Sequence, residues 1–305
     1  MSVTKVDEHV HLIDAETAGM KNFIASYVLE GKQVAMVETG PTSSIENVLK
    51  ALEKLNVNPS SVKYVAVSHI HLDHAGGAGT LLKRLPNAQV VVHPRGAMHL
   101  AHPEKLWEQS QQVLGDITKL YGAPEPIPED RIIPAADGMS FDLGNNIHLS
   151  ALETLGHASH HLSYYESSSR AVFPGDAAGI YLPEIDVIVP TTPPPLRLDI
   201  ALASIQKLKD LKLQSLLYSH FGKATDAAQK LDAYEDQLRL WANIARKGLD
   251  NHETLEMISK RIVEEDTALQ KALRYVKAHP VLGETVLGNS VQGVVEFVQK
   301  YGVIP

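Results

Sequence analysis

Short apolar runs alternate with turn signals along the first two thirds of the chain and predict strands. Runs rich in β-branched and aromatic residues, bounded by Gly, Pro, Asn or Asp, are typical of strands. Helical patterns separate several of them, from Ser43 or Ser44 to Leu55 and again over 80–85. An antiparallel start followed by strand–helix–strand order predicts a mixed sheet with helices packed outside it. The predicted strands are 10–13, 23–29, 33–37, 62–67, 89–93, 147–154, 162–165, 171–174 and 213–218.

The most informative stretch follows the apolar run 62–67, which we interpret as a strand buried on both faces. Four side chains that can bind a metal then fall within six residues: His69, His71, Asp73 and His74. Alternate residues of an extended segment share a face, so His69 and His71 are expected on one side. Imidazole nitrogens and a carboxylate suit a borderline divalent ion such as zinc. The alternative, a polar loop with unrelated histidines, is disfavoured by this spacing.

The same arrangement recurs at three later strand ends, where a potential ligand stands next to or near a glycine. These ligands are His157, Asp176 and His220. Loops that leave strand ends in this way can converge on one point, so the sequence predicts a single metal centre.

Composition narrows the class of protein. The chain has 305 residues, 44% hydrophobic and 21% charged, as expected for one large globular domain or one domain with an appendage. A net charge of −8 disfavours nucleic acid as a partner. Cysteine is absent, which excludes disulfides and thiolate ligands. The beginning of the chain lacks a signal-peptide pattern, and no run approaches the roughly 20 apolar residues of a membrane span, so we expect a cytoplasmic protein.

Two segments between the predicted strands are candidates for the rim of a binding site. Residues 94–131 form an excursion with helical spacing over 105–120, and long excursions often cover active sites. Residues 187–197, which include three successive prolines, are predicted to be rigid and irregular and to border the pocket. Arg197 is a candidate contact for an anionic substrate group, and a surface salt bridge is the alternative.

Beyond Gly222 the pattern becomes helical. An amphipathic pattern over 226–247 predicts one long helix, with Gly248 as the residue that ends it. Further helices are predicted from Asn251 or Thr254 to about Glu265, over 267–278 and over 291–301.

The ordered motifs resemble those of the metallo-β-lactamase-fold hydrolase superfamily, over about residues 10–222. The clustered His and Asp residues match its H-x-H-x-D-H motif. The resemblance implies an α/β fold, a four-layer αββα sandwich with metals at one edge, and a C-terminal helical extension. We therefore expect a catalytic domain over 1–224 and a helical extension over 225–305.

The resemblance also implies two divalent metal ions, with zinc expected and iron or manganese as alternatives. It implies seven ligands: His69, His71 and His157 for one ion, Asp73, His74 and His220 for the other, and Asp176 as the bridge between them.

Three positions depart from the family pattern. Glu38 stands where the family often has an Asp that supports the ligand loop. In the third motif, commonly P-G-H-x-x-G-H, Leu155 replaces the proline and His160 the glycine. His161 matches the second histidine and is expected to be structural, whereas His160 is a candidate substrate contact.

The function implied is hydrolysis. Two ions with a bridging hydroxide and two aspartates leave a pocket charge of about +1, which favours an oxyanionic intermediate or a phosphoryl group. We predict a dinuclear metal-dependent hydrolase that attacks a thioester, lactone or phosphoester in a small, anionic substrate. Asp73 is expected to orient the attacking hydroxide. Tyr181, just beyond Asp176, is the candidate oxyanion donor, with a packed aromatic as the alternative.

Other functions stay open at this point. A mononuclear-iron persulfide dioxygenase shares this scaffold and many of its ligands, and a non-catalytic metal-binding protein is a third alternative. Flavodiiron oxidoreductases usually have Glu where this chain has His71, which argues against them. The C-terminal helices resemble in position the tails of glyoxalase II, which contribute substrate contacts or a homo-oligomer interface. Basic residues do not cluster there, which disfavours a nuclease.

Overall fold

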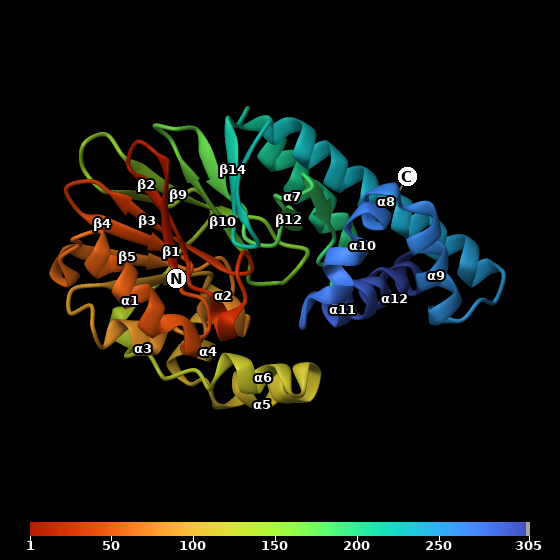
Figure 1. Ribbon diagram of the computed structural model, residues 1–305, viewed down its shortest axis with the longest axis horizontal. Helices are drawn as coiled ribbons and strands as arrows, with labels where there is room; N and C mark the ends of the chain where they lie inside the picture. The colour runs from red at the N-terminus through yellow and green to blue at the C-terminus, as the bar shows by residue number, and fades with distance from the viewer. Residues whose placement is uncertain (303–305) are drawn as a thin grey trace. The chain divides into compact units, whose positions relative to one another are not determined.

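Seven strands hydrogen-bond in chain order to form the first sheet (Figure 1). Its first four strands are antiparallel, and the strands from β4 to β7 are parallel. Parallel neighbours need a crossover connection, and helices provide each of them. The strands are β1 (Ser2–Asp7), β2 (Val10–Asp14), β3 (Ala25–Glu30), β4 (Val34–Val37), β5 (Val62–Ala66), β6 (Gln89–Val92) and β7 (Ile132–Pro134).

The second sheet has six strands in the order β15-β14-β11-β10-β9-β8. It is antiparallel from β8 to β11, and β11 pairs with β14 in parallel. The strands are β8 (Ser140–Asp142), β9 (His148–Glu153), β10 (Leu162–Glu166), β11 (Ala171–Phe173), β14 (Ser215–Tyr218) and β15 (Gly222–Thr225).

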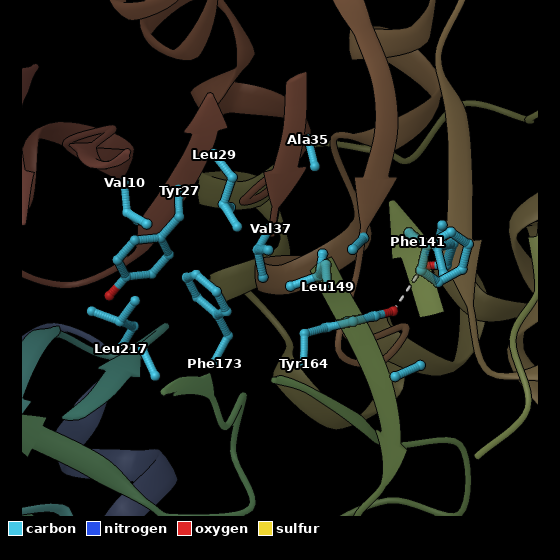
Figure 2. Close-up of a cluster of buried hydrophobic side chains, with 14 of the residues drawn as sticks. Val10, Tyr27, Leu29, Ala35, Val37, Phe141, Leu149, Tyr164, Phe173 and Leu217 are labelled. Atoms are coloured by element: carbon cyan, nitrogen blue, oxygen red, sulfur yellow. Dashed lines mark hydrogen bonds between the residues drawn. The ribbon is translucent and has the colours of Figure 1, made fainter. Parts of the chain in front are cut away.

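The apolar faces of the two sheets meet in one core (Figure 2). Tyr27 of β3 packs edge-on against Phe173 of β11, with ring centroids 5.0 Å apart. The hydroxyl of Tyr164 in β10 donates to the carbonyls of Val67 and Val91, at 2.9 and 3.1 Å. This buried hydroxyl ties the sheets together because the tyrosine brings its polar tip to backbone acceptors.

The computed structural model describes residues 1–302, and the chain divides into two compact units. Unit 1 comprises residues 1–153, 160–175 and 215–223, and contains the core of both sheets. Unit 2 comprises residues 154–159 and 176–214 and the described residues from 224 onward. This division differs from the predicted boundary at 224, because two internal segments belong with the C-terminal helices. The last three residues of the predicted extension, 225–305, lie outside the described residues.

Helices of unit 1 line the face of the first sheet that points away from the second sheet, as α1, α3 and α4 show in Figure 1. The helix predicted over 105–120 is two helices, because Gly115, with φ of 52°, ends α5. β5 is buried at Val65 and Ala66, but it is not buried on both faces throughout, since Tyr64 is partly exposed. The helices are α1 (Ile45–Lys54), α2 (Leu72–Ala75), α3 (Ala78–Leu82), α4 (Pro94–Ala101), α5 (Glu104–Leu114) and α6 (Ile117–Tyr121).

Unit 2 joins a hairpin of β12 (Ile180–Leu182) and β13 (Val187–Val189) to a set of helices. The prediction that 187–197 is irregular is wrong at its beginning, because the apolar run Val-Ile-Val pairs with β12. Helix α7 (Leu198–Asp210), directly after the prolines, was not predicted. The remaining helices are α8 (Ala227–Asp250), α9 (Leu255–Glu265), α10 (Thr267–Ala278), α11 (Leu282–Glu284), the π-helical turn η5 (Thr285–Ser290) and α12 (Val291–Tyr301).

Gly248 does not end the long helix, since α8 continues to Asp250. A Cβ atom at Gly248 would lie 2.5 Å from Cγ1 of Ile258 in α9. The glycine therefore serves close helix packing rather than termination. The predicted α/β class and the C-terminal helical region are both confirmed. Within residues 1–302, no helix has the length and apolar character that crossing a membrane requires.

Candidate metal centre

Five of the predicted metal ligands lie in unit 1, on two loops that leave strand ends. The chain leaves β5 through a bend at Ser68, and α2 begins directly after His71. A tight turn follows α2 at Gly76, where a Cβ atom would lie 2.4 Å from the carbonyl oxygen of Leu72. His220 follows β14, the parallel neighbour of β11. Four of the ligands thus come from one short segment, and the fifth comes from a strand end far away in sequence.

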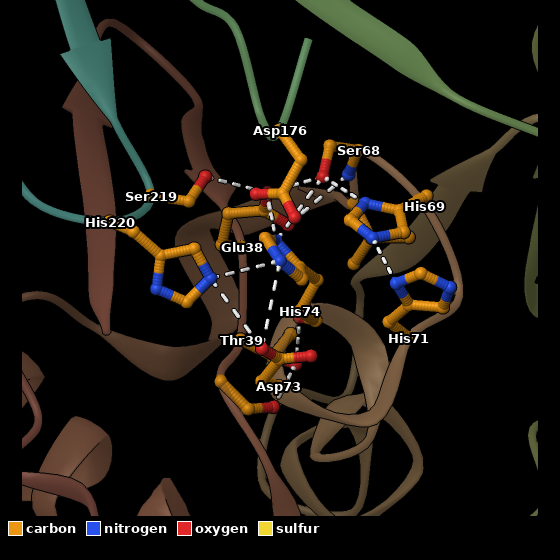
Figure 3. Close-up of polar contacts among 12 residues, drawn as sticks. Glu38, Thr39, Ser68, His69, His71, Asp73, His74, Asp176, Ser219 and His220 are labelled. Atoms are coloured by element: carbon orange, nitrogen blue, oxygen red, sulfur yellow. Dashed lines mark hydrogen bonds and ion pairs between the residues drawn. The ribbon is translucent and has the colours of Figure 1, made fainter. Parts of the chain in front are cut away.

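Asp73, His74 and His220 form a donor set that fits one divalent ion (Figure 3). The Nε2 atoms of His74 and His220 are 3.2 Å apart. An Asp73 carboxylate oxygen lies 3.5 Å from Nε2 of His220 and 3.9 Å from Nε2 of His74. Two nitrogen ligands, each about 2.1 Å from a tetrahedral ion, are about 3.4 Å apart, so these separations match a shared ion.

The remaining ring nitrogen of each histidine in this set has an acceptor. Nδ1 of His74 lies 3.0 Å from Oε1 of Glu38, and Nδ1 of His220 lies 2.7 Å from the carbonyl oxygen of Phe23. Histidines that bind metals characteristically donate this second N–H to a carboxylate or a carbonyl, which orients the ring and fixes its tautomer. The pattern leaves both Nε2 atoms available to bind a metal ion.

Glu38, which the sequence analysis noted only as a departure from the family's usual Asp, supports two loops of the site. Its carboxylate is 1% exposed and accepts from the amide and hydroxyl of Ser68, at 3.1 and 2.5 Å, and from the Ser219 hydroxyl, at 2.9 Å. His74 is its fourth contact. Ser68 and Ser219 each immediately precede a candidate ligand, so Glu38 links the two ligand-bearing loops. An acidic residue directly after a fully buried strand was the signal for this role.

His69 and His71 face each other, with Nε2 of His69 2.8 Å from Nδ1 of His71. His160 also belongs to unit 1, and its ring stacks on that of His69 with centroids 6.2 Å apart. His161 is fully buried, with its ring centroid 5.0 Å from that of His69. A Cβ atom at Gly175 would lie 2.6 Å from Nε2 of His161. The packing supports the structural role predicted for His161.

Unit 2 carries the other two predicted ligands. Nε2 of His157 lies 3.4 Å from a carboxylate oxygen of Asp176, and both residues are buried. Nδ1 of His157 is 2.9 Å from the carbonyl oxygen of Thr191, so this histidine also has an acceptor behind it. Both ligands line a small cavity, together with residues that include Thr192, Ser204 and Tyr234.

The loop that carries His157 depends on Gly156. Its φ is 129°, and a Cβ atom there would lie 2.5 Å from backbone atoms of Ala201 in α7. Its carbonyl accepts from the Arg197 amide at 3.0 Å.

Gly156→Ala is therefore expected to lower the free energy of unfolding by about 2–6 kcal/mol, combining backbone strain with overpacking. Gly138→Ala is the matched control, because Gly138 also has a positive φ, of 78°, but open space around it. Urea denaturation measures both variants. Equal losses would show that the contact with Ala201 contributes nothing.

The other predicted site residues have well-defined partners. The Tyr181 hydroxyl donates to Asp186 at 2.8 Å, and burial together with this carboxylate raises the pKa of Tyr181 to about 12. Arg197 is paired with Asp199, with Nε 2.9 Å from Oδ1, and lies over the Tyr301 ring. The surface salt bridge considered for Arg197 is therefore present, and the catalytic and substrate roles of both residues stay predictions.

Comparison with known proteins agrees with the fold and the motifs. The family model described as the metallo-beta-lactamase superfamily matches residues 21–220. The metallo-beta-lactamase fold-containing protein ST1585 of Sulfurisphaera tokodaii is 30% identical over 218 residues, which are 70% of this chain and 78% of that protein. Its crystal structure has a TM-score of 0.66 at 27% identity and covers 76% of this chain and 86% of that one.

Two further similarities involve a solved structure and a named enzyme. The metallo-beta-lactamase family protein TTHA1429 from Thermus thermophilus has a TM-score of 0.67 at 22% identity, over 92% of this chain and 89% of that one, which supports the fold. A cytoplasmic hydroxyacylglutathione hydrolase of Arabidopsis thaliana is 27% identical over 135 residues, which are 43% of this chain and 40% of that enzyme.

Proposed function

The chain belongs to the metallo-beta-lactamase superfamily, and we propose that it is a metal-dependent hydrolase of ester-type bonds. The observation that carries the proposal is the donor set of Asp73, His74 and His220. Its separations suit one divalent ion, and both of its histidines have an acceptor for their second nitrogen. Side chains with only a structural role would need neither separations that suit a metal ion nor an acceptor for the second nitrogen of each histidine.

We propose further that all seven predicted ligands hold two metal ions. The donor set of unit 1 accounts for one ion, and His69 with His71 supplies only two ligands for another. A zinc-like ion binds four ligands, so further donors are needed, and His157 and Asp176 are the residues that the family motifs assign. Zinc is the expected metal, with iron or manganese as alternatives, since His and Asp donors accept all of them.

Bound divalent ions would supply positive charge for a developing oxyanion and water activated near neutral pH. Asp73 would accept a hydrogen bond from the attacking water and orient it, because its carboxylate is 21% exposed beside two buried histidines. The buried imidazoles and Glu38 keep this arrangement rigid before substrate arrives. Thioesters, lactones and phosphoesters are the substrates to test, and the name of the Arabidopsis relative supports an acylated glutathione as the first of them.

Metal content tests the proposal. Freshly purified protein is expected to contain about two equivalents of divalent metal by elemental analysis, and His71→Ala and Asp176→Ala are expected to lose metal. His252→Ala is the matched control, since His252 lies between α8 and α9 and outside the ligand set. Retention of full metal content in both ligand variants would contradict the seven-ligand centre.

The metal that is found also decides the class of reaction. Two equivalents, with activity on a panel of thioesters, lactones and phosphodiesters, would support the hydrolase. One iron per chain, with oxygen uptake in the presence of glutathione persulfide, would contradict the hydrolase and support the persulfide dioxygenase. Protein that binds no added metal would exclude both enzymes.

A further inference from the structure

We infer that the C-terminal helices of unit 2 position His157 for metal binding through residues 191–195, Thr-Thr-Pro-Pro-Pro, here called the proline strap. The inference rests on the proposed function, in which His157 is a ligand. It assigns positioning roles to Thr192, Ser290 and Gly293. None of these belongs to the ligand motifs, and all three lie in unit 2.

The strap contacts His157 directly. The carbonyl oxygen of Thr191 is 2.9 Å from Nδ1 of His157 and accepts that ring N–H. This hydrogen bond selects the tautomer that binds metal through Nε2, the atom 3.4 Å from the Asp176 carboxylate. A shift of the Thr191 carbonyl would therefore change both the tautomer and the orientation of the ring.

Ser290, at the end of η5, holds the strap from the other side. The Thr192 amide donates to the Ser290 hydroxyl at 3.0 Å, and the Thr192 hydroxyl donates to the Ser290 carbonyl at 2.9 Å. The Ser290 hydroxyl in turn donates to the Thr285 carbonyl at 2.9 Å. This reciprocal pair is buried and joins residues 98 positions apart. It lies at a π-helical turn, a local irregularity that is frequent at functional sites.

Gly293 brings α12 directly onto the strap backbone. A Cβ atom there would lie 1.9 Å from the Thr192 carbonyl oxygen, 2.9 Å from the carbonyl carbon of Pro193 and 3.0 Å from the nitrogen of Pro194. Backbone atoms cannot move aside as the end of a flexible side chain can. The three prolines that follow Thr192 restrict φ on that side, so a displacement at Thr192 is expected to reach Thr191, the residue bonded to it, whose carbonyl contacts His157.

The strap has a third support in α8. Tyr234 is buried, lines the same small cavity as His157 and Asp176, and is hydrogen-bonded to the backbone of Thr191. Helices α8 and α12 thus hold the two ends of the Thr191–Thr192 peptide segment.

The test compares Gly293→Ala with Gly288→Ala. Both substitutions add one methyl group to a helical residue, but a Cβ atom at Gly288 would meet nothing within 4 Å. Zinc affinity is measured by competition with a chromophoric chelator. The His157 ring is followed by proton–nitrogen NMR of the metal-free protein. Gly293→Ala is expected to weaken the affinity for one of the two zinc ions by about 10–100-fold and to shift or broaden the Nδ1–H signal. Gly288→Ala is expected to stay within twofold and to keep the signal.

Ser290→Ala is the second variant, because it removes one hydroxyl and no packing, and it replaces Gly293→Ala if that variant does not fold. It is expected to change the same signal and to weaken the same zinc ion. An unchanged His157 signal with zinc affinity within twofold in the folded variant would overturn the inference. If the wild-type protein binds no zinc, the proposed function fails, and the imidazole signal of the metal-free protein still decides whether the strap positions His157.

Discussion

Asp73→Asn is expected to lower kcat on the best ester-type substrate by about 10²–10⁴-fold, the range that an oriented proton acceptor contributes. Asparagine keeps the shape of the side chain but loses the negative charge and one acceptor atom. Thermal stability is expected to change little, because the Asp73 carboxylate is 21% exposed. Steady-state kinetics with metal content measured on the same sample separate lost ligation from lost orientation.

Asp250→Asn is the control for this substitution, since Asp250 pairs with Arg246 on the surface of α8. It is expected to keep full activity. Asp73→Asn that retains both metal equivalents and more than a tenth of the wild-type kcat would refute the role of Asp73 in orienting the attacking water.

Glu38→Ala is expected to lower the free energy of unfolding by about 3–5 kcal/mol, as breaking a buried, hydrogen-bonded charge does. Removal of the carboxylate would leave buried donors of Ser68, Ser219 and His74 without their acceptor. Each such donor costs about 1–3 kcal/mol. Because Glu38 orients His74, zinc affinity is expected to fall as well, by about 10–100-fold. Urea denaturation and chelator competition measure the two effects.

Glu166→Ala is a matched control for Glu38→Ala. Glu166 is also a fully buried carboxylate that accepts from serines, here Ser168 and Ser169, but it contacts none of the candidate ligands. Its substitution is expected to reduce stability and to leave zinc affinity within twofold. Equal losses of zinc affinity in the two variants would mean that Glu38 acts through stability alone.

Glu38→Asp restores the residue that the family often has at this position. The carboxylate would be withdrawn by one methylene, so it could not keep all four contacts at their present lengths. We expect an intermediate loss of zinc affinity, which distinguishes the need for a charge from the need for this reach. The longer side chain thus suits this particular pair of loops, each of which presents a serine hydroxyl.

Local patterns predicted most of the strands and all of the candidate ligands. A strand is recognised from a short run of apolar residues, and a candidate ligand from a polar residue near a glycine at the end of that run. Each of these patterns spans only a few consecutive residues, so it can be recognised without the tertiary structure. The wrong predictions for 187–197 and for Gly248 arose because nearby residues were given too much weight. Three prolines dominated the interpretation of 187–197 and concealed β13, and no helix was predicted after them, where α7 begins at Leu198. Gly248 resembled a helix terminator because its packing partner, Ile258, lies on another helix.

The sequence by itself determined which side chains could bind a metal, their order along the chain, and most of the strands that carry them. Only the tertiary structure decided how those side chains are held. The contacts of Glu38 with Ser219, of Thr191 with His157 and of Ser290 with Thr192 join residues 181, 34 and 98 positions apart. No sequence period encodes such pairs, because they form only where folded elements pack and a buried polar group must find a partner.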